Sequence, residues 1–223
     1  MQQNTLQRKL IWPGWLRLAH WGMALSVLVL LATSWLLEWS PSVAKAASDY
    51  HVIAGAFLML SLLLRLWLLI TDKTVAGWQA LVPSRKSLDA MMKTARFYIS
   101  LGNMPLPGWY AHNPLWVPVY GMVLVVLFIM ALSGFFMPSH PVMMGFYLPT
   151  IHKSMATLVW IFTFAHIIAV VMHDAKAKHS DVSGMINGYR IFELKPLDTG
   201  ESPTGGQGVH KVSIDKIQIR KKG

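Results

Sequence analysis

The chain contains no cysteine and few charged residues. None of its 223 residues is Cys, and only 13% are Asp, Glu, Lys or Arg. The lack of thiols excludes covalent c-type haem, thiolate-bound iron–sulfur clusters, disulfides and a cysteine nucleophile. Soluble domains carry about a quarter charged residues, so low charge together with 54% hydrophobic residues indicates a membrane protein. Any redox chemistry of this chain must therefore use non-covalent cofactors.

Four apolar stretches are long enough to cross a hydrocarbon layer of about 30 Å. They include only three charged side chains, Arg17, Arg65 and Lys153. The first stretch is too long for the apolar region of a cleavable signal peptide, and we expect it to be a retained helix. The predicted spans are residues 15–37, 50–70, 115–137 and 148–172.

The net charge of +10 is distributed unevenly between the two sides of the predicted membrane domain. The segments on one side hold sixteen lysines and arginines, and the loops on the other side hold Lys45 alone. The basic segments are residues 1–14, 71–114 and 174–223, and the two loops are residues 38–49 and 138–147. This asymmetry predicts a bacterial inner-membrane protein with both termini in the cytoplasm. The basic residues then contact lipid headgroups, and a nucleic-acid partner is not expected.

The segment between the second and third spans is too long to be a bare loop. Within it, residues 86–100 place Leu88, Met91, Met92, Ala95 and Tyr98 on one helical face. We therefore predict an all-α integral membrane fold, a four-helix bundle with an amphipathic cytoplasmic helix between helices 2 and 3. The predicted parts are a basic arm (1–14), the membrane domain (15–173), a post-membrane segment (174–195) with a short ordered element at 184–195, and a flexible basic tail (196–223).

Four histidines form two pairs of matched depth. His152 and His166 are fourteen residues apart, which is about 21 Å and close to four whole turns, so both leave one face of one helix. His20 matches the depth of His166 near the cytoplasmic surface, and His51 matches His152 near the opposite surface. A titratable ring in hydrocarbon is costly without a partner. The pairing predicts bis-histidine ligation of two b haems, which transfer electrons and leave no open iron site for a substrate.

Residues near the predicted haems support this interpretation without deciding it. Small residues follow three of the histidines by four positions, at Ala24, Gly55 and Ala156. They allow a flat macrocycle to approach, but ordinary helix packing explains them equally well. Arg65 lies on the face of His51 at the level of the inner haem, where it can pair with haem propionates or extend to the headgroups.

Three polar residues near the cytoplasmic surface are candidates for a quinone site beside the inner haem. His112 and Asn113 precede the third span, where they can hydrogen-bond a quinone carbonyl or cap a helix. His173 lies seven residues beyond His166, where it can relay protons or be an ordinary interfacial histidine.

These motifs resemble a known family. The motifs are RLAHW at 17–21, HVIAGAF at 51–57 followed by RLW, HNP at 112–114, the His152–His166 spacing and MINGYR at 185–190. Over about residues 10–192 the chain resembles the b-type cytochrome subunit of membrane-bound nickel–iron hydrogenases, in the bacterial cytochrome b561-like group that includes formate dehydrogenase gamma subunits. The resemblance implies a subunit that anchors periplasmic iron–sulfur and catalytic subunits and passes their electrons through haem b to quinone.

Other functions remain open on sequence alone. The same subunit can serve a formate dehydrogenase or a thiosulfate reductase. A stand-alone diheme cytochrome b561 would oxidise superoxide or a small reductant and reduce quinone by itself. A small transporter or adaptor would use the histidines to bind metal. The chain has no Walker motif, dinucleotide fingerprint or credible catalytic triad, so we expect an electron-transfer subunit whose catalytic partner is another polypeptide.

The charge asymmetry predicts the orientation of the chain. A fluorescent protein fused after Gly223 should fluoresce, and alkaline phosphatase at the same position should be inactive. The same reporters inserted after Ser139 should give the opposite pattern. Phosphatase activity from the Gly223 fusion would reverse the predicted orientation.

Overall fold

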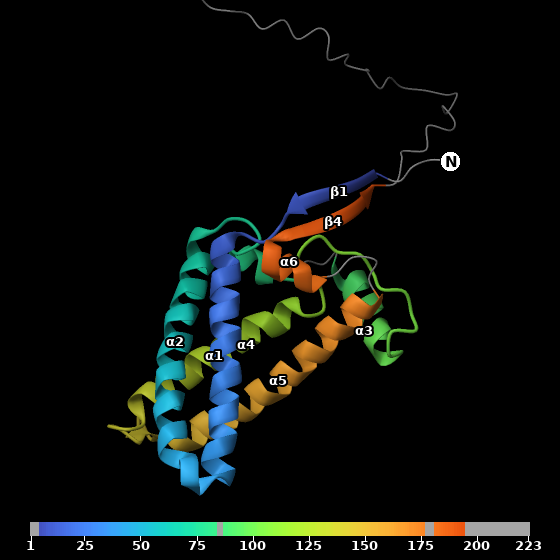
Figure 1. Ribbon diagram of the computed structural model, residues 1–223. Helices are drawn as coiled ribbons and strands as arrows, with labels where there is room; N and C mark the ends of the chain where they lie inside the picture. Colours follow the sequence, from blue (N-terminus) through green and yellow to red (C-terminus); the bar gives the residue numbers. More distant parts are fainter. Residues whose placement is uncertain (1–4, 84–86, 177–180, 195–223) are drawn as a thin grey trace, which may run out of the picture.

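The computed structural model describes residues 5–83, 87–176 and 181–194. The predicted tail at 196–223 lies outside the described residues. Four long helices dominate the fold, and each is long and apolar enough to cross a membrane (Figure 1). They are α1 (Gly14–Trp39), α2 (Ala44–Thr71), α4 (Val117–Phe136) and α5 (Leu148–Lys176). The predicted all-α integral membrane fold with four spans is confirmed.

The bundle is built from two helix pairs. α1 packs along α2, α4 packs along α5, and α2 joins the pairs by contacting α4. A Cβ atom at Gly22 of α1 would lie 2.3 Å from Ser61 Oγ of α2, so a small residue is needed at this close approach. The buried core consists of Val27, Leu30, Leu31, Ala54, Leu58, Leu62, Leu127, Met130 and Val159. Many other large apolar side chains of these helices point outward, as lipid-facing residues do.

The predicted helix between the second and third spans is present as α3 (Leu88–Ile99). The predicted apolar face was assigned to the membrane surface, and the side that packs on the protein is a different one. Thr94 and Phe97 are fully buried, whereas Leu88 and Met92 are exposed. Phe97 lies against His173 of α5, with ring centroids 5.8 Å apart. This contact brings α3 to the end of α5 (Figure 1).

A two-stranded sheet joins the two ends of the described chain. β1 (Thr5–Leu10) pairs antiparallel with β4 (Tyr189–Leu194), and Leu10 lies opposite Tyr189. The helix α6 (Asp181–Asn187) precedes β4, so the element expected at 184–195 is a helix turn followed by a strand. We did not predict the pairing with residues 5–10. The short hairpin of β2 (Val142–Met143) and β3 (Phe146–Tyr147) lies at the other end of the bundle (Figure 1).

Gly188 lies between α6 and β4, at the point where the sheet begins. It has a φ of +89°, and its carbonyl oxygen accepts hydrogen bonds from the N–H groups of Ile11 and Trp12 at 2.9 and 3.0 Å. A Cβ atom at this position would lie 2.9 Å from the Trp12 carbonyl oxygen. Only glycine adopts this backbone conformation without strain and allows the two segments to approach so closely.

Replacing Gly188 with Ala should therefore loosen the terminal sheet while the helices remain folded. The expected cost is about 1–3 kcal/mol in local stability. Hydrogen exchange should show faster exchange of the amides in β1 and at Ile11 and Trp12. Gly108→Ala is the matched control, because a Cβ atom at Gly108 meets nothing within 4 Å. Unchanged amide protection in Gly188→Ala would show that the backbone conformation at Gly188 does not stabilise the sheet.

Candidate functional site

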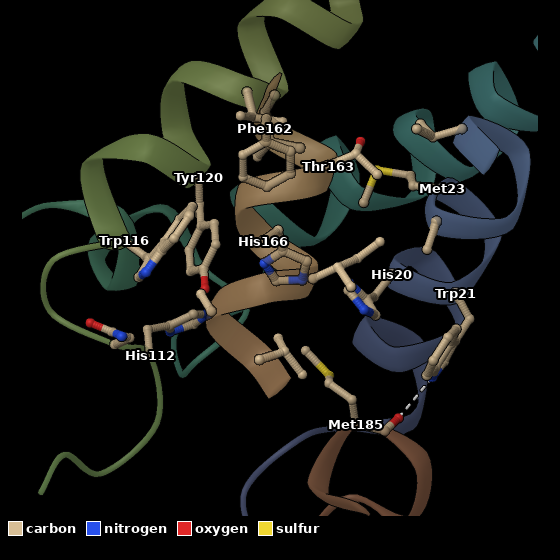
Figure 2. Close-up of a pocket in the computed structure, with 18 of the residues that line it drawn as sticks. His20, Trp21, Met23, His112, Trp116, Tyr120, Phe162, Thr163, His166 and Met185 are labelled. Atoms are coloured by element: carbon tan, nitrogen blue, oxygen red, sulfur yellow. Dashed lines mark hydrogen bonds between the residues drawn. The ribbon is translucent and has the colours of Figure 1, made fainter. Parts of the chain in front are cut away.

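A cavity of about 460 Å³ lies at the sheet end of the bundle. Its wall is formed by α1, α2, α4, α5 and residues 109–113. Cofactor sites commonly have volumes of about 300–1,000 Å³. His20 from α1 and His166 from α5 face each other across it, and their ring centroids are 6.4 Å apart (Figure 2).

The second histidine pair has the same separation. The ring centroids of His51 and His152 are also 6.4 Å apart. Two metal–nitrogen bonds of about 2 Å and two ring radii of about 1.1 Å together span roughly 6.2 Å. Each spacing therefore fits one metal ion held between two imidazoles. Val159 of the core lies seven residues from both His152 and His166, so apolar packing separates the two pairs along α5.

A hydroxyl group on α1 sets the protonation of His51. Thr33 Oγ1 donates its proton to carbonyl oxygens of its own helix, those of Val29 at 2.8 Å and Leu30 at 3.1 Å. A hydroxyl has one proton and two lone pairs. Thr33 Oγ1 therefore accepts at its 2.9 Å contact with His51 Nδ1, which places the ring proton on Nδ1 and leaves Nε2 bare for a metal.

Ser133 on α4 has the same role beside His152. Its Oγ donates to the Met130 carbonyl oxygen at 3.0 Å and lies 3.1 Å from His152 Nδ1. The Met130 carbonyl oxygen is also 3.1 Å from His152 Nδ1. Both oxygens accept from an Nδ1–H group, and Nε2 is again bare. A Cβ atom at Gly134 would lie 3.0 Å from His152 Cε1, so glycine leaves room for the ring. Sequence reasoning missed Thr33 and Ser133, although a hydroxyl on an apolar helix is a visible signal.

The three predicted small residues have different surroundings. A Cβ atom at Gly55 would meet nothing within 4 Å, so the face of α2 next to His51 is open. Ala24 lines the cavity beside His20. Ala156 packs against the core instead, which is ordinary helix packing. Two of the three positions thus leave room for a flat group beside a histidine pair.

Arg65 lines the same cavity and is only 5% exposed. Its Nη1 donates to the carbonyl oxygen of Ala76 at 2.7 Å. It therefore holds the segment after α2 against the bundle and does not extend to the surface. Its position on the cavity wall leaves its charge available to an anionic group in the cavity.

Two of the three quinone candidates, Asn113 and His173, meet at Tyr98, which sequence reasoning did not select as a site residue. The Tyr98 hydroxyl oxygen accepts from Trp116 Nε1 at 2.7 Å and from Asn113 Nδ2 at 3.2 Å. Its own proton is then directed to His173 Nε2, at 2.8 Å. Asn113 and His173 are both 6% exposed. Tyr98 could not be paired with His173 from sequence, because 75 residues separate them.

Asn113 also caps the start of the following helical segment, which was the alternative to a role in binding quinone. Its Oδ1 accepts from the Leu115 N–H at 3.1 Å while its Nδ2 binds Tyr98. His112 also lines the cavity (Figure 2). Its ring lies 5.0 Å from that of Trp12. Burial, and then the positive charge of Arg65, lower the pKa of His112 to about 4. His112 is therefore a neutral imidazole at neutral pH.

The MINGYR motif closes the cavity from the sheet side. The carbonyl oxygen of Met185 accepts from Trp21 Nε1 at 2.9 Å, next to His20 (Figure 2). The carbonyl oxygen of Ile186 accepts from Arg17 Nη1. Arg190 lines the cavity and donates to the carbonyl oxygens of Trp109 and Tyr110, both at 3.1 Å. The motif thus ties the start of α1 to the segment that carries His112 and Asn113.

Comparison with known proteins agrees with this architecture. The chain is 22% identical over 220 residues to a protein of Cupriavidus necator named "Probable Ni/Fe-hydrogenase B-type cytochrome subunit", covering 85% of this chain and 90% of that protein. No solved structure matches the chain significantly. The family model described as prokaryotic cytochrome b561 matches residues 11–188. The chain therefore belongs to the prokaryotic cytochrome b561 family of membrane b-type cytochromes, whose cofactor is haem b.

Proposed function

We propose that this cytochrome is a diheme membrane-anchor subunit that passes electrons from a periplasmic oxidoreductase to quinone. The observation that carries the proposal is the equal 6.4 Å separation of two histidine pairs at two depths of one bundle. His20 and His166 hold the inner haem, and His51 and His152 hold the outer one. Bound haem b would supply reversible one-electron transfer.

The remaining residues orient these groups and exclude water. Thr33 and Ser133 hold the outer rings by Nδ1 and leave Nε2 bare for a metal. The core residues around Val159 keep the space between the two levels apolar. Arg65 and Arg190 line the inner cavity and would supply positive charge to haem propionates. With both histidines of each pair as ligands, the iron would have no open site for substrate.

The donor is proposed to be a nickel–iron hydrogenase with its iron–sulfur and catalytic subunits. The name of the Cupriavidus relative supports this choice over a formate dehydrogenase or a thiosulfate reductase. The uneven distribution of lysine and arginine supports placing the sheet end in the cytoplasm and the β2–β3 hairpin in the periplasm. The donor then meets the His51–His152 end first.

Quinone is proposed to bind beside the inner haem. Asn113, Tyr98 and His173 form a connected hydrogen-bond cluster at the cavity wall. His112 lines both this cavity and a second one beside Lys73 and Gln79, which gives a route for protons from the cytoplasmic side. Protons would be taken from the cytoplasm, whereas electrons would arrive from the periplasm. Charge therefore crosses the membrane, and the transfer is electrogenic. Each charge moved costs roughly 2.3 kcal/mol per 100 mV of membrane potential, which the donor–quinone potential gap must exceed.

The ligand assignment predicts a selective loss of haem. His152→Ala should lose the outer haem and keep the inner one, because the two pairs share no residue. The measurement is haem content per chain together with the reduced-minus-oxidised spectrum. The control is His140→Ala, which changes an exposed loop histidine whose side chain, within the described residues, is hydrogen-bonded to Ser139, and it should keep both haems. Two low-spin haems in His152→Ala would refute the assignment.

The quinone proposal predicts variants that separate haem reduction from quinone reduction. Asn113→Ala and His173→Ala should slow quinol formation roughly tenfold or more, since one charge-relay or carbonyl hydrogen bond in a catalytic site is worth that much. Both variants should keep two haems that the donor reduces at the parental rate. Asn103→Ala, at an exposed position, is the control. Quinol formation at the parental rate in both variants, or an inhibitor bound beside His51, would place the site elsewhere.

A further inference from the structure

The two histidine pairs differ in what surrounds their second ring nitrogens. At the outer pair, oxygen atoms accept from both Nδ1–H groups, among them that of Thr33 on His51 and those of Ser133 and Met130 on His152. At the inner pair, neither His20 nor His166 has a hydrogen bond within the described part of the chain. The rings next to His166 are aromatic instead, with Phe162 stacked at 5.4 Å and Trp116 at 6.1 Å.

This difference has an electronic consequence for a bound metal. An acceptor on Nδ1–H draws the proton away from the ring, so the imidazole becomes a stronger electron donor through Nε2. A stronger donor stabilises ferric iron relative to ferrous iron, and the haem reduction potential falls. Hydrogen bonding to the axial ligands is one of the main ways in which a protein sets this potential.

We propose that the Thr33 and Ser133 hydroxyls hold the reduction potential of the outer haem below that of the inner haem. Electrons arriving at the periplasmic end then pass to the inner haem in the favourable direction, against the membrane potential. This inference rests on the proposed function, because it needs one haem at each histidine pair. Thr33 and Ser133 are positioning residues, since they act through His51 and His152.

The two hydroxyls have similar surroundings. Each donates to a carbonyl oxygen of its own helix, Thr33 to that of Leu30 and Ser133 to that of Met130. The same carbonyl oxygen is also an acceptor for the histidine, Leu30 for His51 and Met130 for His152. A carbonyl oxygen therefore remains beside each ring when its hydroxyl is removed, and Thr33→Val and Ser133→Ala should have effects of similar size.

The test is a potentiometric titration of the purified, haem-loaded protein, followed at the α-band of reduced haem. The parent should titrate in two steps, and the single step left in His152→Ala should coincide with the higher one. Thr33→Val should move the lower step upward and leave the higher step in place. Ser133→Ala should also move the lower step upward, and Thr33→Ser should restore the parental curve.

The control is Thr157→Val. Thr157 Oγ1 also donates to a carbonyl oxygen of its own helix, that of Lys153 at 3.2 Å, but its side chain is exposed. Both steps should stay in place in this variant. Two results would overturn this inference alone. One is a Thr33→Val protein with two haems whose titration steps do not move, and the other is a His152→Ala protein whose single step coincides with the lower parental step. A parent with fewer than two haems would overturn the proposed function, and this inference with it.

Discussion

The 6.4 Å separation between imidazole rings on neighbouring helices is the constraint on which the rest of the structure depends. Each pair takes one ring from α5 and the other from α1 or α2, so a shift of any of these helices along its axis would separate the rings. Gly22 of α1 lies close to Ser61 of α2, where these two helices pack side by side. Val159 of α5 lies in the same core as residues of α1, α2 and α4, midway between the two pairs. Close packing in the centre therefore helps to set both ring separations at once.

The two ends of the bundle have the same separation between histidine rings but different surroundings. At the His51–His152 end, Thr33, Ser133 and the glycine at 134 hold the rings tightly. At the His20–His166 end, the protein leaves a cavity edged by hydrogen-bonding groups and closed by the MINGYR segment. This difference agrees with the proposed direction of transfer. The His51–His152 end would hold only a fixed electron carrier, and the His20–His166 end would also admit an exchangeable ligand.

Much of this fold could be predicted from the sequence, because the spans and the amphipathic helix depend on local patterns. The histidine pairs could be predicted as well, because depth in a membrane is a one-dimensional property that residue spacing determines. The contacts of Tyr98 with His173 and of β1 with β4 could not, because they join distant residues across loops with no periodic pattern. The protein-facing side of α3 could not be predicted either, because Phe97 is buried against His173 of the distant helix α5.

The central claim is that one chain holds two bis-histidine haems at two depths. The most direct test is the haem-to-polypeptide ratio of the purified chain, determined together with the spin state of the ferric iron. The account predicts two haems b per chain, both low-spin. A ratio of one, a high-spin haem with an open coordination site, or the absence of haem bands would contradict it.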